Sequence, residues 1–330
     1  MILAVDGGAT KTVALVYDET KLELIGLGIS GPTNLTSVPR EEIVFNIHEA
    51  VTKACEQANI TIKDIGKGLF GIAGIGDSPS LTKSGIEIIA ESTGRSDFTV
   101  MNDGRPAYQM ANLDSDGIVF AGGTGSVAFF KNGEIIERRG GWNWFAGDNS
   151  SASWIAKRGL NLATLEYDGL LDEKHLVNSV ETDFANDFRE VIASIEKTQN
   201  KRHVAGFAPY VTKLASLGYP PAMEILDECA AYVVRLIESL LPKFKKTPRI
   251  SLVGGTMLAG NIYTDRIKER LNVPIDVFYG YQVAAGAILL MLKDMGVNCT
   301  FITRDSILTQ MEYLLEKISK KELKRYLNMN

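Results

Sequence analysis

Apolar runs and amphipathic segments alternate along almost the whole chain. The first 30 residues contain three apolar runs, over 2–5, 13–17 and 22–29, which small and polar residues separate. Runs of this length between glycine-rich breaks are typical of β-strands joined by tight turns. From 40 to 59, apolar residues recur every three or four positions, which predicts an amphipathic helix.

Two further strands and two further helices are predicted before residue 116. The strands are expected over 67–73 and 98–101, and the helices over 81–93 and from about Arg105 onward. The first region therefore has the predicted order βββαβαβα. Strands that alternate with helices in this way favour an α/β sheet.

The rest of the chain repeats the strand-rich pattern and interrupts it with a helical stretch. Prolines at 209, 220 and 221 punctuate that stretch. The predicted strands are a hairpin over 118–130 and single strands at 134–139, 249–253 and 275–278; the predicted helices cover 152–165, 177–196, 205–216, 222–240, 258–271 and 282–293, with an amphipathic tail over 306–327.

The first predicted turn carries groups suited to a polyphosphate. It lies in the sequence Asp6-Gly7-Gly8-Ala9-Thr10-Lys11-Thr12. Glycines let backbone amides approach a ligand oxygen, and the Thr-Lys-Thr run adds hydroxyl and ammonium donors. Asp6, at the mouth of a buried strand, is suited to a hydrated Mg²⁺. An ordinary hairpin with a solvated lysine fits this stretch equally well when it is taken alone.

The same layout recurs about a hundred residues later. Ile118 to Phe130 is an apolar run, the turn Gly122-Gly123-Thr124-Gly125, and a second apolar run. Gly7 aligns with Gly122 and Gly8 with Gly123 without a gap. A unit repeated at this distance indicates a duplicated domain and not a short-period solenoid. Two such hairpins, one in each domain, would clamp a nucleotide between them.

Length and composition narrow the class of protein. The chain has 330 residues, which suits two domains, with 45% hydrophobic and 23% charged residues. Its net charge of −5 gives no basic excess for a nucleic acid, and the longest apolar run, 283–292, is too short for a bilayer. The three cysteines have no disulfide or metal-binding spacing. These features predict a cytoplasmic enzyme with neither a nucleic-acid nor a membrane partner.

Four segments in order give the chain a family resemblance. The two hairpins are similar to the phosphate-1 and phosphate-2 motifs of the actin-like superfamily of sugar kinases, heat-shock ATPases and actin. The run 250–256 resembles its adenosine motif and 280–290 its second connecting helix. Within this superfamily the chain resembles the N-acetylglucosamine kinase branch and its BadF/BadG/BcrA/BcrD-type ATPase relatives. The resemblance covers nearly the whole chain.

The resemblance implies an α/β fold of duplicated ribonuclease H-like (actin-like) domains with an interdomain nucleotide cleft. Residues 1–116, joined by the C-terminal helices over about 300–330, would form the first domain. Residues 117–299 would form the second, with a helical insertion. ATP and Mg²⁺ are the implied cofactors, and Asp6 is the expected metal ligand. The expected nucleotide-binding residues are Asp6, Gly7, Gly8, Thr10, Lys11, Thr12, Gly122, Gly123, Thr124, Gly125, Gly254, Gly255 and Thr256.

Asp103 is the candidate catalytic residue. It follows a predicted strand, and acidic groups at the carboxyl ends of such strands face the crevice of an open α/β sheet. There a carboxylate can accept the proton of a hydroxyl that attacks the γ-phosphate. The family's base lies in a similar Asn-Asp pair. The alternative is an N-cap for the helix that begins near Arg105.

Further substrate contacts follow from the resemblance. Asn34 would bind sugar hydroxyls, or else satisfy its own turn. Asp148 matches an acidic residue that binds hydroxyls in the relatives, and Trp142 either stacks on substrate or fills the core. The expected substrate-binding residues are Asn34, Asp103, Arg105, Gly123, Gly141, Trp142 and Asp148.

Two departures from the family favour an acidic substrate. Arg105 stands two positions after Asp103, where relatives have small residues, and Asn149 replaces a glutamate. Arg105 can pair with Asp103, reach a carboxylate, or remain solvated. The leading expectation is therefore an ATP-dependent carbohydrate kinase for 2-keto-3-deoxygluconate. The alternatives are N-acetylglucosamine or glucose kinase, an ATPase that activates a partner enzyme, and a nucleotide-binding regulator. A homodimer is left open.

Two other sequence features do not support a further type of binding site. Gly26-Leu27-Gly28-Ile29-Ser30-Gly31 matches the dinucleotide pattern GxGxxG, but Pro32 follows and no helix opens there. A radical-enzyme activator would need cysteines near the domain junction to bridge an iron–sulfur cluster, and residues 56–228 contain none. Neither a dinucleotide site nor an iron–sulfur cluster is expected.

Overall fold

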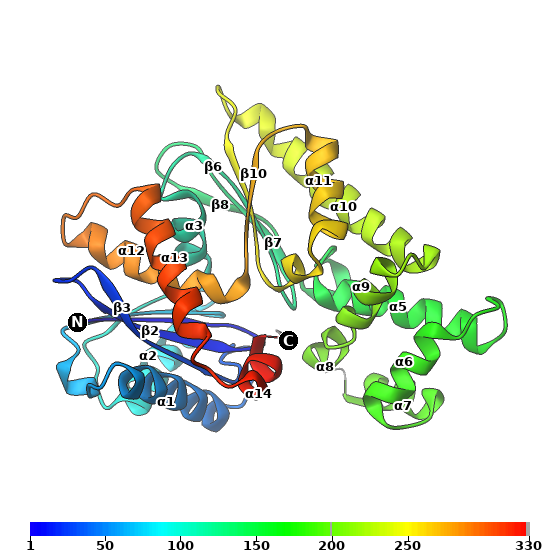
Figure 1. Ribbon diagram of the computed structural model, residues 1–330, viewed down its shortest axis with the longest axis horizontal. Helices are drawn as coiled ribbons and strands as arrows, with labels where there is room; N and C mark the ends of the chain where they lie inside the picture. Colours follow the sequence, from blue (N-terminus) through cyan, green and yellow to red (C-terminus); the bar gives the residue numbers. More distant parts are fainter. Residues whose placement is uncertain (199, 328–330) are drawn as a thin grey trace. The chain divides into compact units, whose positions relative to one another are not determined.

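The computed structural model describes residues 1–198 and 200–327 (Figure 1). Two compact units are present: residues 1–114 with the chain from 280 onward, and residues 115–279. The predicted domain extents include residues 199 and 328–330, which lie outside the described residues. The helix over 284–294, expected in the second domain, packs on strands of the first unit.

The first unit is built on a five-stranded sheet of order β3-β2-β1-β4-β5. β2 is antiparallel to β1 and β3, whereas β4 is parallel to β1 and β5. β1 and β2 are buried along their whole length, because helices cover both faces of the sheet. The strands are β1 (Ile2–Gly7), β2 (Thr12–Asp18), β3 (Glu23–Ser30), β4 (Lys67–Ile72) and β5 (Thr99–Met101).

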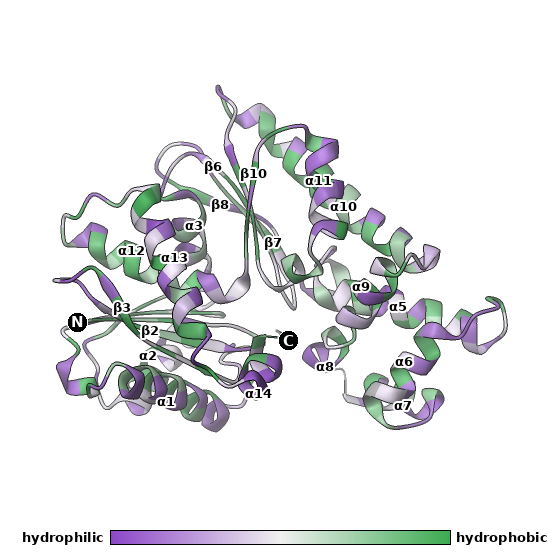
Figure 2. Cartoon of the chain, in the orientation of Figure 1, coloured by the Kyte–Doolittle hydropathy of each residue, from purple (hydrophilic) through white to green (hydrophobic). Residues whose placement is uncertain are grey.

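Helices form a layer on each face of this sheet (Figure 1). α1 and α2 pack together on one face, and α3, α12 and α13 lie on the other. α1 presents a hydrophobic side and a hydrophilic side, as its spacing predicts, whereas α14 is hydrophilic (Figure 2). The helices are α1 (Arg40–Gln57), α2 (Pro79–Thr93), α3 (Gly104–Asn112), α12 (Ala284–Asp294), α13 (Phe301–Leu315) and α14 (Lys320–Glu322), with short turns η1 (Ile62–Asp64), η4 (Gly280–Val283) and η5 (Leu323–Leu327).

The GxGxxG pattern has a packing role in this unit. Gly26 and Gly28 lie in β3, directly under α1. A Cβ added to Gly28 would lie 2.1 Å from the carbonyl oxygen of Ala50, and one added to Gly26 would lie 2.1 Å from that of Ala54. Only glycine allows the helix backbone to approach the strand this closely.

The second unit repeats the sheet of the first. Its order is β10-β9-β6-β7-β8, with β7 antiparallel to β6 and β8, and β9 parallel to β6 and β10. β6 therefore occupies the position of β1, and the expected duplication is confirmed. The strands are β6 (Gly117–Gly122), β7 (Ser126–Lys131), β8 (Ile136–Gly140), β9 (Arg249–Val253) and β10 (Ile275–Phe278).

Helices of the second unit form a core with β6, β7 and β9. Apolar side chains of α5, α6, α9 and α10 supply most of it, which is the reason for the helical spacing in this stretch. The helices are α4 (Asn143–Ala146), α5 (Ala152–Tyr167), α6 (His175–Phe184), α7 (Phe188–Thr198), α8 (Lys201–Ala205), α9 (Ala208–Ser216), α10 (Pro220–Leu240) and α11 (Asn261–Leu271), with short turns η2 (Leu241–Lys243) and η3 (Gly255–Ala259).

Four predicted helical segments differ from the structure. The helix expected over 205–216 begins only at Ala208, and the tail over 306–327 is divided between α13 and α14. The segment 177–196 is two helices, because Ala185 adopts a left-handed φ of 48° and ends α6. α7 then begins at Phe188, where Asp187 Oδ1 accepts a hydrogen bond from the amide of Arg189 in the first turn of the helix. The helix expected over 258–271 begins only at Asn261, after Gly260 with a φ of 72°. Gly254 therefore immediately precedes η3, Gly255 is the first residue of η3, and neither glycine opens the long helix.

Candidate functional site

The first hairpin turn lies between Gly7 and Thr12, the last paired residues of β1 and β2. The amide of Gly8 donates to the carbonyl oxygen of Lys11 at 3.0 Å and closes the turn. The buried hydroxyl of Thr12 donates to Gly31 O at 2.7 Å and lies 3.0 Å from Thr33 Oγ1. Thr12 therefore anchors the neighbouring loop, and a contact of its hydroxyl with a nucleotide stays a prediction.

Three charged side chains interact at this turn. Burial raises the pKa of Asp6 to about 7, and the nearby carboxylate of Asp103 adds to the rise, while Lys11 opposes it. Burial also lowers the pKa of Lys11, against the attraction of Asp6. The fold thus brings together the two predicted acids and the predicted lysine, although Asp103 is about a hundred residues away in sequence.

The donor set fits a partly hydrated cation. The Asp6 carboxylate is buried and is repelled by the charge of Asp103, and both effects raise its pKa. A cation bound beside Asp6 would offset this repulsion. Within the described residues no group of three or more His, Cys, Asp or Glu side chains could hold a metal by itself. Mg²⁺ commonly keeps waters and uses one or two carboxylates together with substrate phosphates, so this set is suitable.

Asp103 lies between β5 and α3. Asp103 occupies the N-cap position of α3, but its side chain makes no capping hydrogen bond to the helix. The neighbouring Asn102 forms two hydrogen bonds to backbone groups. Its Oδ1 accepts from Gly104 N at 2.9 Å, and its Nδ2 donates to Ile75 O at 2.9 Å. Burial raises the pKa of Asp103 to about 6, with a further rise from Asp77 and an opposing effect of the amides of residues 103 and 104.

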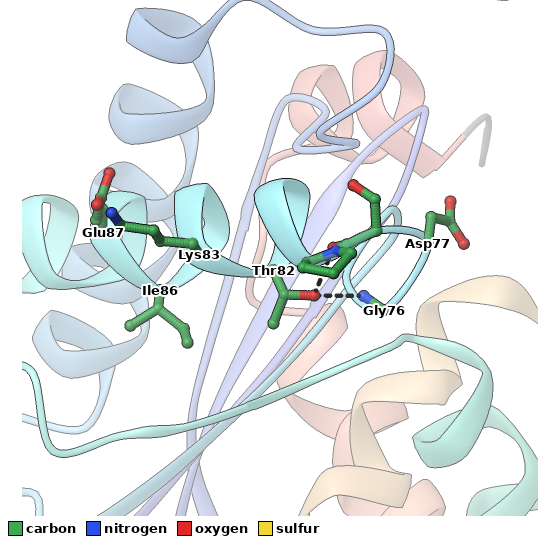
Figure 3. Close-up of a pocket in the computed structure, with 8 residues that line it drawn as sticks. Gly76, Asp77, Thr82, Lys83, Ile86 and Glu87 are labelled. Carbon is green, nitrogen blue, oxygen red and sulfur yellow. Dashed lines mark hydrogen bonds between the residues drawn. The ribbon is translucent and has the colours of Figure 1, made fainter.

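A surface hollow of about 730 Å³ lies at the beginning of α2 (Figure 3). The amide of Gly76 donates to Thr82 Oγ1 at 3.0 Å and fixes the loop, and Asp77 projects from it away from α2 (Figure 3). Asp77 is close enough to Asp103 to raise its pKa. Sequence reasoning missed Asp77, although it lies in the loop after β4 as Asp103 lies in the loop after β5.

Asn34 satisfies its own loop. Its Oδ1 accepts from the amide of Thr36 at 2.8 Å and from the hydroxyl of Thr36 at 2.7 Å. The next amide, of Leu35, donates to Ala73 O beyond the end of β4. This is the turn alternative that the sequence left open. A contact of Asn34 with sugar stays a prediction.

Arg105 lies on α3 and contacts Asp114 at the other end of the helix. Its guanidinium forms an ion pair with the Asp114 carboxylate, and the ammonium of Lys293 on α12 donates to the same carboxylate at 2.5 Å. The sequence allowed three roles for Arg105, and the structure shows a different one. Through Asp114, Arg105 links α3 to α12. Because the Arg105 guanidinium is held by Asp114, its place near Asp103 in the sequence no longer favours an acidic substrate.

The second hairpin is packed against the predicted adenosine motif. β6 and β7 pair up to Gly122 and Ser126, and Gly123 N donates to Gly125 O at 2.8 Å. The hydroxyl of Thr256 donates to Gly122 O at 3.0 Å. Gly254 has a φ of 124°, and a Cβ there would lie 2.1 Å from the same carbonyl oxygen. The two glycine-rich motifs of this unit are therefore in direct backbone contact.

The segment from 140 to 151 lies beside the second hairpin. Gly141 N donates to Ser126 O at 3.1 Å, and Ser126 Oγ donates to Asn149 O at 2.7 Å. Trp142 is 72% exposed, so it does not fill the core, whereas Trp144 packs partly buried against the core. A substrate contact of Trp142 or Gly141 stays a prediction.

Asp148 is the buried acid of this segment. It is only 5% exposed and has a left-handed φ of 55°. Its Oδ2 accepts from the ammonium of Lys201 at 2.5 Å. Sequence reasoning missed Lys201, because 53 residues separate the pair and nothing in the helical pattern marks this lysine among its neighbours. The tertiary fold alone pairs it with Asp148.

Comparison with known proteins agrees with this organisation. Residues 3–291 match the model of the BadF/BadG/BcrA/BcrD ATPase family. The glucosamine kinase GspK of Vibrio cholerae is 24% identical over 273 residues, which cover 83% of this chain and 88% of that protein. The N-acetylmuramic acid/N-acetylglucosamine kinase of Clostridium acetobutylicum is 24% identical over 283 residues, covering 82% and 90%.

Solved structures show the same fold. A protein from Chromobacterium violaceum, provisionally assigned as an N-acetylglucosamine kinase, superposes with a TM-score of 0.71 at 21% identity, covering 88% of this chain and 98% of that one. A ROK family glucokinase from Streptomyces griseus, in complex with glucose and AMPPNP, gives 0.56 at 17% identity, covering 89% and 99%. No helix in the described part of the chain is both long and apolar enough to cross a membrane.

Proposed function

The chain belongs to the BadF/BadG/BcrA/BcrD ATPase family and has the actin-like ATPase fold, and on this premise we propose that it is an ATP-dependent amino-sugar kinase. The resemblance that the sequence suggested is thereby confirmed. The observation that carries the proposal is the cluster of Asp6, Lys11 and Asp103, in a chain whose curated relatives are named as kinases of amino sugars.

Asp103 is the proposed general base. The oxygen of a sugar hydroxyl attacks the γ-phosphorus of ATP, the hydroxyl proton passes to the Asp103 carboxylate, and the bond from phosphorus to the ADP oxygen breaks. A pKa near 6 suits this task, because the carboxyl is mostly ionised near neutral pH and still basic enough to accept a proton.

Asp6 and Lys11 are the proposed phosphate-side residues of the first hairpin. Bound Mg²⁺ would neutralise charge on the phosphates of ATP, and Asp6 is the residue that would hold it. Lys11 offers an ammonium group beside the open turn at Gly8, where a Cβ would meet nothing closer than 3.9 Å. The backbone amides of that turn can therefore approach an anion without steric hindrance.

The proposed acceptor is N-acetylglucosamine or glucosamine and not 2-keto-3-deoxygluconate, which was the leading expectation from the sequence. Both curated relatives support this choice by their names. The ion pair of Arg105 with Asp114 also removes the main reason to expect a carboxylate on the substrate. Asn34 and Asp148 remain the proposed hydroxyl-binding residues.

The test is a coupled ADP-release assay with Mg·ATP and a panel of glucosamine, N-acetylglucosamine, N-acetylmuramic acid, glucose and 2-keto-3-deoxygluconate. Turnover on an amino sugar supports the proposal. Turnover on 2-keto-3-deoxygluconate alone would keep the kinase reaction and reject the amino sugar. ATP hydrolysis that no sugar accelerates would reject the kinase and favour a regulator or an ATPase, of which the family description names the ATPase.

A further inference from the structure

The turns of the two hairpins differ by one residue. Pairing of β1 with β2 ends at Gly7 and Thr12, which leaves 8–11 as the first turn. Pairing of β6 with β7 ends at Gly122 and Ser126, which leaves 123–125 as the second. The first turn contains Lys11, whereas the second is Gly-Thr-Gly and contains no cation of its own.

A lysine from another element reaches the second turn. Lys201 is the first residue of α8, and its ammonium lies 2.5 Å from Oδ2 of Asp148. A Cβ added to Gly125 would lie 3.0 Å from the Lys201 ammonium and 2.8 Å from Asp148 Oδ2. The ion pair therefore lies directly against the turn, at a position that is open only because residue 125 has no side chain.

The arrangement parallels that of the first hairpin. There Lys11 interacts with the buried Asp6 beside a glycine turn, and here Lys201 interacts with the buried Asp148 beside a glycine turn. The side chain of Lys201 is 25% exposed, so part of this lysine is accessible, whereas Asp148 is buried. An ammonium group has three donors, and can contact a phosphate oxygen while it still contacts a carboxylate.

We propose that Lys201 is a phosphate-binding residue of the second hairpin, which supplies from α8 the positive charge that the shorter turn lacks. The ligand is the polyphosphate of a nucleoside triphosphate. This inference rests on the proposed nucleotide-dependent function and adds to it a residue from the helical segment between β8 and β9. The competing role is positioning, in which Lys201 only neutralises Asp148 and holds it for the sugar.

The two roles predict different measurements on the full chain. The probe is Mg·AMPPNP, titrated by calorimetry without sugar into the wild-type protein and the variants Lys201→Met, Lys201→Arg and Lys213→Met. Lys213 is an exposed lysine of α9 and serves as the matched control. We expect Lys201→Met to weaken AMPPNP binding about 10- to 100-fold, the usual effect of losing a charge-assisted hydrogen bond. Lys201→Arg, which keeps the charge, should retain most of the affinity, and Lys213→Met all of it.

A second comparison guards against a structural artefact. Removing Lys201 alone leaves the buried Asp148 carboxylate without its partner, which can destabilise the fold. We therefore compare Asp148→Asn with the double variant Asp148→Asn/Lys201→Met, in which no buried charge is left. If Lys201 binds phosphate, the double variant should bind AMPPNP about 10- to 100-fold more weakly than Asp148→Asn. If Lys201 only positions Asp148, the two variants should bind AMPPNP equally.

The phosphate role would be overturned if Lys201→Met bound AMPPNP as tightly as wild type, and the double variant as tightly as Asp148→Asn. A raised KM for sugar would not change that conclusion. A wild-type protein that binds AMPPNP but phosphorylates no amino sugar would reject the proposed kinase function, and the Lys201 comparison would still decide the present inference. A wild-type protein that binds no AMPPNP would overturn both.

Discussion

Arg105 and Asp114 form an ion pair that spans the length of α3, and Lys293 of α12 contacts the same carboxylate. Burial, the largest influence, raises the pKa of Asp114, but the hydrogen bonds from Arg105 and Lys293 outweigh it and bring the pKa to about 2. A residue pair that suggested substrate recognition from the sequence is therefore a contact that stabilises the first unit.

This ion pair predicts a loss of stability in acid. An unfolded aspartate has a pKa of about 3.9, so the pair stabilises the fold fully above about pH 4 and loses its effect as the pH falls through about 2. Asp114→Asn should lower the free energy of unfolding at pH 7 by about 1–2 kcal/mol and flatten its pH dependence between 4 and 2. Urea unfolding at several pH values checks this. The exposed Asp172→Asn is the control, and equal pH profiles for wild type and Asp114→Asn would contradict the assignment.

The proposed base predicts a specific effect on turnover. Asp103→Asn removes the proton acceptor but keeps the shape of the side chain, so kcat should fall about 10²–10⁴-fold while nucleotide binding is preserved. Steady-state kinetics with the best amino sugar and AMPPNP titration measure the two quantities. Asp294→Asn, at the exposed end of α12, is the control. Near-normal kcat in the Asp103 variant would reject its role as base.

The pKa values of Asp6 and Asp103 predict the pH profile of the reaction. Burial raises the pKa of Asp6 to about 7 and that of Asp103 to about 6, and the Asp103 carboxylate adds to the rise at Asp6. Both must be ionised in the proposed reaction, so kcat/KM should rise with pH and level off above about 7. Below that region the decline should be steeper than for a single group. A rate that does not change between pH 5 and 8 would be inconsistent with this assignment.

The two adjacent glycines of the first hairpin should respond differently to alanine. A Cβ on Gly7 would lie 2.2 Å from Thr33 Oγ1 and 2.6 Å from Ile72 Cδ1, whereas one on Gly8 would meet nothing closer than 3.9 Å. Gly7→Ala should therefore destabilise the protein by about 1–3 kcal/mol, the usual cost of overpacking. Gly8→Ala should leave stability nearly unchanged. Chemical denaturation measures the free energy of unfolding of both variants. Equal values for the two would show that the packing around Gly7 can relax.

Much of the strand and turn pattern of both units could be predicted from local sequence pattern. The hairpin around Gly7 and Gly8, the repeat at Gly122 and Gly123, and the order of strands and helices all follow from apolar runs broken by glycine. These features depend on neighbours within a few residues, where β-strand alternation, helical spacing and turn chemistry act directly. The same reasoning selected Asp6, Lys11 and Asp103, which the fold brings into one electrostatic group.

Contacts between distant residues were decided only by the tertiary structure. Nothing in the sequence around Arg105 distinguishes a substrate contact from an ion pair with Asp114, and nothing near Lys201 indicates that it lies on Asp148. A single charged residue carries no periodicity, and its partner depends on how whole helices pack. The sequence by itself determined the strands, the repeated hairpins and the acids at their ends, because these arise from local backbone preferences. The tertiary structure decided the partner of each charge, because burial and long-range approach set the electrostatic energy.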